Sequence, residues 1–388
     1  MEKALSPKVR DWLLQSVSSL DDLIDLRWRR LKQRMGWDGI PRIQPYIGFA
    51  NEHFAWVHGR VLSNPPRELP GEDDRWWDNL LQMYQRFESD EVVGVTVEIE
   101  FADTRHRVVT DGEGYFHLET PQVSGVRGCQ LWKSITMRIV DDHRIGPDES
   151  ATVSKMLTPP LTARFGIISD IDDTVLHTGI AGLMTAARLT FLHNARTRKP
   201  LSGVAALYRA MQQGGETPSD CHSNPIFYVS SSPWNLFDLL EDFLDLNDIP
   251  SGPILLRDLG FDRNKFLKEG HDHKLEKAIR IMSAYPQLPF ILFGDSGQED
   301  ARIYAEAARQ RPQQIKAIFI RDVDPHIDSP LDIRVQASVE AARAVGVPMH
   351  VIPNSCDAAE VLLRMGLIHE ASMASIEADT VADQLHRV

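Results

Sequence analysis

The sequence FGIISDIDDT at residues 165–174 places a short apolar run directly before a cluster of acidic residues. Four similar apolar runs follow, each separated from the last by a helical pattern, at residues 226–229, 290–293, 317–320 and 349–352. Short, continuously apolar strands that alternate with helices are typical of a parallel sheet covered on both faces. We therefore predict an α/β domain over residues 160–370, followed by a tail at residues 371–388.

The N-terminal part of the chain shows a different pattern, in which apolar residues alternate with polar ones. Strand patterns of this kind occur at residues 54–62, 92–101 and 134–140. A glycine-rich turn at residues 111–114 predicts a hairpin, and several strands at this spacing favour an antiparallel β-sandwich. We predict this sandwich over residues 41–155, with an insertion at about residues 65–91, behind a helical lead at residues 1–40.

The composition excludes several classes of protein. Of the 388 residues, 43% are hydrophobic and 25% are charged, which argues against disorder as the main state. The net charge of −13 gives the chain no general attraction for nucleic acid or anionic lipid. The sequence has no apolar run of ~18 residues and no signal-peptide pattern, and its three scattered cysteines indicate neither disulfides nor a zinc site. We expect a cytoplasmic protein without a transmembrane segment.

One basic stretch, RWRRLKQR at residues 27–34, departs from this acidic average. Either a solvated helix face or an interfacial helix anchored by Trp28 accounts for it. The sequence does not decide between these alternatives. It also leaves open whether the sandwich domain binds a protein partner.

Acidic and hydroxyl side chains follow three of the predicted parallel strands. Asp170 and Asp172 come after the first strand, Ser230 after the second, and Asp295 and Asp300 after the third. Parallel strands end at one edge of their sheet, and ligands bind beyond that edge. Carboxylates crowded there repel one another, and a hard divalent cation such as Mg²⁺ removes that repulsion. The pattern predicts a Mg²⁺ site that binds a phosphate group.

The same side chains suggest roles in the transfer of a phosphoryl group. With Mg²⁺ on Asp170 and Asp295, the Asp170 carboxylate is placed to attack phosphorus, and Asp172 to protonate the leaving alcohol. Ser230 and Lys274 would hold the remaining phosphate oxygens. Lys274 opens a predicted helix whose apolar face leads to the third strand.

Four motifs in order resemble those of the haloacid dehalogenase superfamily. They are D-x-D-x-T at residues 170–174, Ser230, Lys274, and G-D followed by Asp300 at residues 294–300. Chance produces a lone D-x-D-x-T often, whereas four motifs at the expected strand ends and helix are specific. The resemblance covers about residues 162–324, which is less than half of the chain.

The exact residues of these motifs narrow the resemblance to one family within the superfamily. The segments SDIDDT, YVSSSPW, HK and GDSGQED are similar to the phosphatidate phosphatases of the actin-patch-associated type and to their bacterial relatives. The turn TDGEGYF at residues 110–116 is similar to the region that those proteins carry ahead of the catalytic domain. The residues of the phosphatase reaction are all present in this sequence, but no motif in it recognises an acyl chain. The resemblance therefore supports the phosphatase reaction more strongly than the lipid substrate.

The resemblance implies a three-layer haloacid-dehalogenase-like fold and Mg²⁺-dependent conversion of phosphatidic acid to diacylglycerol at a membrane surface. It also implies an aspartyl-phosphate on Asp170, and Asp172 as the acid that then activates water. Thr174 would brace the turn after Asp172. Asp172 and Asp300 would join Asp170 and Asp295 around the metal, with Asp300 orienting the metal ligands or Lys274.

The spacing of the motifs indicates an open site. The gaps from Thr174 to Ser230 and from Ser230 to Lys274 leave no room for a large cap domain, which suits a bulky or membrane-held substrate. Nearby basic side chains would then steer an anionic head group, with a solvated loop as the alternative: His177, Arg196, Arg198 and Lys199.

Other functions remain possible from the sequence. One is a phosphatase of a protein or soluble metabolite, and another is a scaffold that binds phosphate without turnover. A serine protease is excluded, because GDSG at residues 294–297 follows an apolar strand in an α/β pattern and the chain has no disulfide framework. The absence of G-x-S-x-G leaves a lipase-type hydrolase unsupported.

Overall fold

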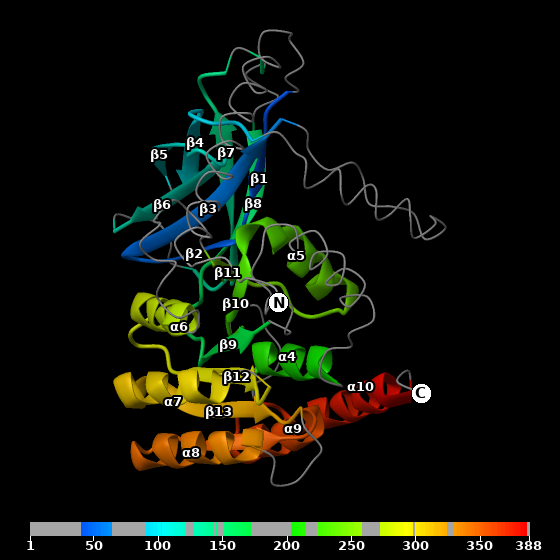
Figure 1. The fold of residues 1–388 in the computed structure, drawn as a ribbon. Coiled ribbons are helices and arrows are strands. Elements are labelled where there is room, and N and C mark those ends of the chain that lie inside the picture. Colours follow the sequence, from blue (N-terminus) through cyan, green and yellow to red (C-terminus); the bar gives the residue numbers. More distant parts are fainter. Residues whose placement is uncertain are drawn as a thin grey trace, which may run out of the picture.

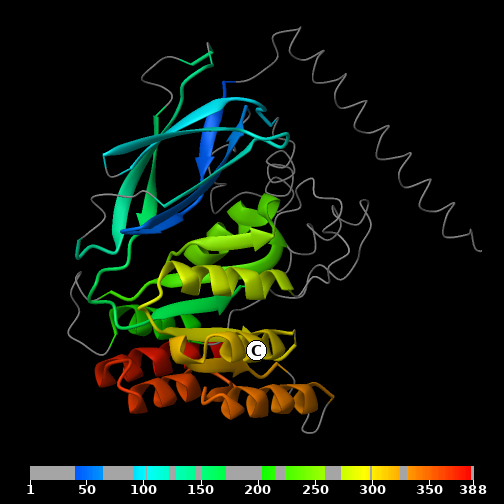
Figure 2. The ribbon, with the colours of Figure 1, turned by 90° about the vertical axis from the view of Figure 1, so that its left-hand side faces the viewer.

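The computed structural model contains two β-sheets, which lie one above the other in Figure 2. It describes residues 40–63, 91–101, 103–121, 128–142, 144–145, 151–171, 203–214, 223–257, 272–297, 299–323 and 330–385. The predicted helical lead and the predicted insertion fall, apart from their last residues, outside these ranges.

The first sheet has eight strands in the described part of the chain, and it is curled (Figure 1). Its strands are β1 (Arg42–Pro45), β2 (Gly48–Asn51), β3 (Phe54–Leu62), β4 (Thr96–Phe101), β5 (Thr104–Val109), β6 (Tyr115–Thr120), β7 (Trp132–Ile139) and β8 (Ala151–Leu157). Their order is β1-β3-β2-β8-β7-β4-β5, with β6 also paired to β3. The ladders are antiparallel except for the parallel pair β2–β8.

The turn at residues 111–114 joins the two ends of the curled sheet. We predicted a hairpin here, but β5 pairs with β4 and β6 pairs with β3. The turn itself forms, because the Asp111 carboxylate accepts hydrogen bonds from the backbone N–H groups of Glu113 and Tyr115 at 2.9 Å each. Phe116 then packs so closely on β3 that a Cβ on Gly59 would lie 2.4 Å from its ring. The turn therefore connects the β4–β5 pair to the β3–β6 pair, and the curl of the sheet brings these two pairs together.

The second sheet has six strands, all parallel, in the order β11-β10-β9-β12-β13-β14. They are β9 (Gly166–Asp170), β10 (Ile226–Pro233), β11 (Ile254–Arg257), β12 (Phe290–Asp295), β13 (Ile315–Arg321) and β14 (Met349–Ile352). Five of these are the apolar runs of the sequence, and β11 was not predicted. The first strand in the sequence, β9, lies in the middle of the sheet, so the chain builds outward on both sides of it.

Helices cover both sides of the parallel sheet (Figure 1). They are α4 (Val204–Gln213), α5 (Phe237–Leu246), α6 (Asp272–Ala284), α7 (Asp300–Gln310), α8 (Pro330–Ala344), α9 (Ser355–Arg364) and α10 (Met373–Leu385), with single 3₁₀ turns at Trp234–Leu236, Pro312–Gln314 and Glu370–Ser372. Helices α6, α7 and α8 lie on one side, and α4, α5, α9 and α10 on the other. The predicted α/β alternation is confirmed.

The segment predicted as a tail contains a packed helix. Helix α10 contacts α4 and α9, and its residues Ile376 and Thr380 are buried. A Cβ on Gly203, at the start of α4, would lie 2.1 Å from the Thr380 hydroxyl. The prediction of a loose end was wrong over residues 373–385, because this segment forms a helix that packs on α4 and α9.

Aromatic side chains join the two sheets into one hydrophobic core. Tyr46 after β1 stacks on Trp234 after β10, with ring centroids 5.0 Å apart, and Phe49 of β2 meets Phe227 of β10 edge-on at 5.6 Å. The hydroxyl of Tyr285 donates a hydrogen bond to the buried carbonyl of Ala50 at 3.1 Å. The curled sheet therefore packs against β10, the strand that contains Ser230.

Candidate active site

The register of the parallel sheet brings the predicted site residues to one edge. Asp170, the last residue of β9, lies opposite Val229 of β10, so Ser230 follows beside it. On the other side, Ser169 lies opposite Phe293 of β12, so Gly294 and Asp295 extend past the same edge. The topology alone therefore places Asp170 between Ser230 and Asp295.

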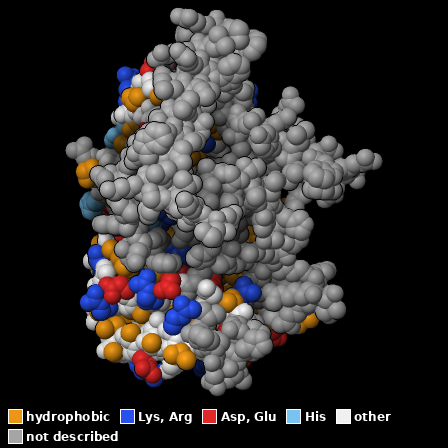
Figure 3. Space-filling model, in the orientation of Figure 1, with side chains coloured by type: hydrophobic (Ala, Val, Ile, Leu, Met, Phe, Trp, Pro, Cys, Tyr) orange, Lys and Arg blue, Asp and Glu red, His pale blue; other side chains and the backbone are white. Residues whose placement is uncertain are grey.

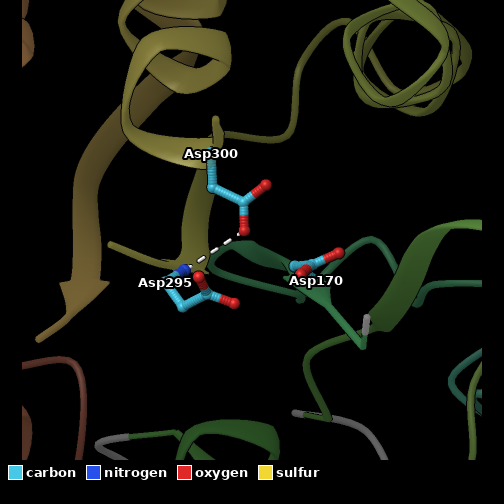
Figure 4. Close-up of side chains that lie close together, drawn as sticks. All are labelled: Asp170, Asp295 and Asp300. Carbon is cyan, nitrogen blue, oxygen red and sulfur yellow. Dashed lines mark hydrogen bonds between the residues drawn. The ribbon is translucent and has the colours of Figure 1, made fainter. Parts of the chain in front are cut away.

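Three carboxylates converge at this edge (Figure 4). Side-chain oxygens of Asp170, Asp295 and Asp300 lie within 4.8 Å of one another. Asp300 opens α7 and turns back toward β12, where its Oδ2 accepts a hydrogen bond from the backbone N–H of Asp295 at 3.1 Å. Gly294 makes this approach possible, because a Cβ there would lie 2.6 Å from the Cβ of Asp300. Among the described residues, this is the cluster that has the donors for a metal ion.

Lys274 links two of the three carboxylates. Its Nζ lies 2.7 Å from Oδ1 of Asp170 and 3.0 Å from Oδ1 of Asp300, and the Lys274 side chain is only 2% exposed. Burial of a charge without a partner is costly, so the ammonium and the carboxylates depend on each other. Helix α6 thus supplies a buried cation that contacts both Asp170 and Asp300.

The Ser230 loop is also held by α6. Ser230 is fully buried, and its Oγ accepts a hydrogen bond from the backbone N–H of Ser232 at 2.9 Å. Its carbonyl accepts a hydrogen bond from the ammonium of Lys277 at 2.6 Å. Lys277 was not predicted as a site residue. Its spacing could have identified it, because a residue three positions after Lys274 lies on the same face of the helix.

Two buried tyrosines support the strand ends, and the sequence analysis did not identify them. The hydroxyls of Tyr208 and Ser169 are 2.8 Å apart, and the Tyr304 hydroxyl donates to the carbonyl of Phe293 at 3.1 Å. Burial, followed by the charges of Asp300 and Asp170, raises the pKa of Tyr304 well above its usual value. Burial likewise raises the pKa of Tyr208. Both phenols therefore stay neutral and serve as hydrogen-bonding supports.

The remaining predicted site residues lie outside the part of the chain that the structure describes. These residues are Asp172, Thr174, His177, Arg196, Arg198 and Lys199. Of the predicted set, the structure brings together Asp170, Ser230, Lys274, Asp295 and Asp300.

The chemistry of the described cluster fits a hard divalent cation. Three carboxylates face a single ammonium, which leaves an excess of negative charge at a largely buried position. All of the available donors are oxygen atoms, which Mg²⁺ prefers, and none is a thiolate or an imidazole. The same excess of charge would repel a phosphate unless a cation lay between them.

No helix among the described residues combines the length and the hydrophobicity that a membrane crossing requires.

The comparison with solved structures shows only weak likeness. A carbohydrate acetylesterase from Xanthomonas citri aligns with 81% of this chain and 68% of its own length, at a TM-score of 0.28 and 11% identity. A similarity at that level does not support any argument about fold or function.

The comparison with curated proteins is more informative. Phosphatidate phosphatase APP1 of Saccharomyces cerevisiae is 35% identical over 158 residues, which cover 40% of this chain and 25% of that protein. An uncharacterized protein of Schizosaccharomyces pombe is 32% identical over 168 residues, covering 42% of this chain and 26% of its own length. The alignments thus span about a quarter of either relative. The family described as "Phosphatidate phosphatase APP1, catalytic domain" matches residues 165–322, the stretch that contains the carboxylate cluster, Ser230 and Lys274. Residues 165–322 of this chain are therefore similar to the phosphatidate phosphatase APP1 catalytic domain.

Proposed function

We propose that this protein is a phosphoric monoester hydrolase that converts phosphatidic acid to diacylglycerol. One observation carries the proposal: the segment that matches the phosphatidate phosphatase catalytic domain encloses the buried cluster of Asp170, Lys274, Asp295 and Asp300. A structural role explains one aspartate at a strand end. It does not explain three carboxylates that converge beside a buried lysine in a segment that matches this catalytic domain.

Asp170 is the proposed nucleophile. A carboxylate oxygen of Asp170 attacks phosphorus, the bond between phosphorus and the ester oxygen breaks, and Asp172 gives its proton to the leaving alcohol. Asp172 then takes a proton from water, whose oxygen attacks the aspartyl-phosphate and releases inorganic phosphate. The contact with Lys274 at 2.7 Å fixes the Asp170 carboxylate for the first attack. Ser230 and Lys274 hold the phosphate oxygens, Asp300 positions Lys274, and Thr174 braces the turn that carries Asp172.

Mg²⁺ is the proposed cofactor, held by Asp170 and Asp295, with Asp172 and Asp300 completing the acidic surroundings. When bound, it supplies positive charge that lets an anionic phosphate approach an anionic nucleophile. Binding has a readout that does not depend on turnover. Mg²⁺ should raise the melting temperature of the wild-type protein and have a much smaller effect on Asp295→Asn. An equal shift in both proteins would remove Asp295 from the ligand set.

The finer fold assignment is part of the same proposal. The parallel sheet, with helices on both sides and acidic residues past its central strands, is proposed to be a three-layer haloacid-dehalogenase-like domain. The curled sheet is proposed to be the predicted antiparallel β-sandwich domain. We also propose that the protein acts at a membrane surface, where phosphatidic acid resides.

The test is phosphate release from phosphatidate in mixed micelles, with a soluble aryl phosphate alongside, in Mg²⁺ and in chelator. Lipid hydrolysis that requires Mg²⁺ and disappears in Asp170→Asn supports the whole proposal. Asp103→Asn is the matched control, because the change is the same and asparagine tolerates the positive φ of 63° at that turn. An acid-quenched wild-type reaction should contain a peptide phosphorylated at Asp170.

Other outcomes separate the parts of the proposal. Hydrolysis of the soluble ester alone would keep the mechanism and reject the lipid substrate. Near-normal turnover by Asp170→Asn would reject the nucleophile. Binding of phosphate without turnover of either substrate would favour a scaffold protein.

A further inference from the structure

A groove with a volume of about 570 Å³ lies between α7 and α8. Small apolar residues line much of it, namely Ala301, Ala305, Ala337, Ala341, Ala344, Val335 and Val345. Figure 3 shows this region at the lower left, where hydrophobic side chains lie just below a row of charged ones. Because alanine side chains are short, the two helices pack together and still leave space along their outer seam.

One end of this groove belongs to the loop of the active site. Ser296 and Glu299 line it, and they stand between Asp295 and Asp300 in the sequence. Helices α7 and α8 follow β12 and β13, so both begin at the edge of the sheet where the carboxylates converge. The groove therefore starts beside the proposed phosphate site and runs away from it along the two helices.

The length of the groove suits a single hydrocarbon chain. Its lining extends along α7 from Glu299 to Arg309, a distance of about 15 Å at the rise of an α-helix. The hydrocarbon core of a bilayer is about 30 Å thick, so one acyl chain in one leaflet spans about 15 Å.

The residues around the groove suit contact with a lipid layer. Three arginines line it, Arg302, Arg309 and Arg334, with side chains 55%, 69% and 65% exposed, and they form ion pairs with Glu299 and Glu306, which also line the groove. Arginine can lay its apolar stem on hydrocarbon and keep its charge in the head-group region. Near the active-site end, Val323 is 43% exposed and Ile333 is 68% exposed. Exposed aliphatic side chains beside ion-paired arginines suit contact with the boundary between head groups and hydrocarbon.

We propose that the α7–α8 groove binds one acyl chain of the phosphorylated lipid while its phosphate lies at Asp170. This inference rests on the proposed function and adds the element that recognises the lipid. It assigns specificity for a long chain to a surface outside the catalytic motifs, which themselves contact only the phosphate and the metal.

The first test fills the groove from exposed positions on α8, where a larger side chain does not disturb the core. Ala337→Trp and Ala341→Trp are compared with Gln336→Trp, an exposed position on the same helix that does not line the groove. The measurement is the ratio of kcat/KM for dipalmitoyl phosphatidate to that for dihexanoyl phosphatidate in mixed micelles. We expect both alanine variants to lower this ratio about tenfold, and Gln336→Trp to keep the wild-type ratio. An unchanged ratio in the alanine variants overturns the inference.

The second test does not require turnover. A phosphonate analogue of phosphatidate with a diazirine at the end of one palmitoyl chain is photolysed with the full-length protein in micelles. We expect cross-links in α7 and α8 that are reduced in Ala341→Trp and retained in Gln336→Trp. Labelling elsewhere, or equal labelling of both variants, overturns the inference.

The two tests also separate failure of this inference from failure of the proposed function. Hydrolysis of both phosphatidates with an unchanged chain-length ratio keeps the activity and rejects the groove. Cross-linking in the groove without hydrolysis of either phosphatidate keeps the chain-binding site and rejects the activity. Loss of both signals rejects both.

Discussion

The two sheets of this protein bury their side chains in different ways. In the curled sheet, β4 and β5 alternate between more and less exposed residues along their length, so one face meets solvent. In the parallel sheet, the first four residues of β9 and of β12 are all buried, because helices cover both faces. A polar residue is thus ordinary in the first sheet and exceptional in the second.

This difference shows where sequence carries information about chemistry. Glu98 in β4 forms an ion pair with Arg107 in β5 at 2.9 Å, on the outer face of the curled sheet. Such a pair contributes little to stability. Asp170 and Asp295 stand at the ends of strands that are otherwise apolar, where a charge must have partners. Their partners are Lys274 and Asp300, and these four residues lie together with Ser230 in the candidate site.

The largest effect should come from breaking the buried ion pair of the parallel sheet. Asp300→Ala removes one partner of Lys274 and the acceptor for the Asp295 N–H, so we expect the unfolding free energy to fall by about 3–5 kcal/mol and turnover to be lost. Urea unfolding and phosphate release measure the two effects. Asp379→Ala, which breaks the exposed pair with Arg209 at 3.1 Å, is the control and should cost about 0–1 kcal/mol. Equal losses in the two variants would contradict the comparison.

Truncation of one aliphatic residue in each sheet should give the next largest difference. Ile168 in β9 is fully buried, so Ile168→Ala should cost about 2–5 kcal/mol. Val109 in β5 is 61% exposed, and Val109→Ala should stay within about 0.5 kcal/mol. Chemical denaturation of both variants is the measurement, and a loss above 2 kcal/mol at Val109 would show that the outer face of the curled sheet is covered.

The curled sheet should lose stability in acid through His58. Burial, and to a smaller extent His117, lowers the pKa of His58 from 6.5 to about 3. The unfolded chain therefore binds this proton at a higher pH than the folded chain does. Stability is complete above pH 6.5 and falls by about 1.4 kcal/mol per pH unit as the pH drops toward 3. His58→Phe should flatten this part of the stability profile, and a profile parallel to the wild type would contradict the assignment.

The rings that surround His58 explain why it stays neutral. They belong to both halves of the molecule and are those of Tyr46, Trp56, Tyr115, His117 and Trp234. Trp234 is the nearest of these, with its ring centroid 4.1 Å from that of His58. A charge on His58 would therefore weaken the contact between the two sheets.

The parallel-sheet unit should respond to pH in the opposite direction, and by a smaller amount. Burial, followed by the charges of Asp238 and Asp245, raises the pKa of Glu241 on α5 from 4.5 to about 7. The folded chain holds this proton more tightly, so stability is complete below pH 4.5 and declines as the pH rises to 7. Glu241→Gln should gain about 2 kcal/mol over the wild type at neutral pH and little in acid. Thermal unfolding at both pH values measures this, and an equal gain at both would contradict it.

The sequence predicts the parallel sheet well because continuous apolar runs leave few alternatives. The missed strand β11 has only three apolar residues, Ile254 to Leu256, between a proline and an arginine. Strand β8 was missed because Thr152, Ser154 and Lys155 interrupt its apolar residues. In the curled sheet, β3 to β7 were predicted, whereas β1 and β2 were also missed. The strand partners were not predicted, because pairing depends on how the sheet bends.

The sequence predicted those residues of the candidate site whose positions follow from strand order alone. Strand order brings Asp170, Ser230 and Asp295 together whatever the side-chain rotamers are. Tyr208 and Lys277 were missed, since their roles depend on how far each helix is rotated about its own axis. The hydrophobic pattern gives that rotation only to within a residue or so.

The central position of β9 has a consequence for synthesis of the protein. A ribosome completes the curled sheet first and then β9, but β12, which pairs with one edge of β9, follows roughly 120 residues later, after about 6–24 s of translation. During that interval the nascent chain carries an apolar strand without its second neighbour. The aromatic side chains of the curled sheet are already available and can cover β10, as Phe49 covers Phe227 in the finished protein. During translation, the curled sheet would cover apolar surface of the unfinished parallel sheet until β12 is made.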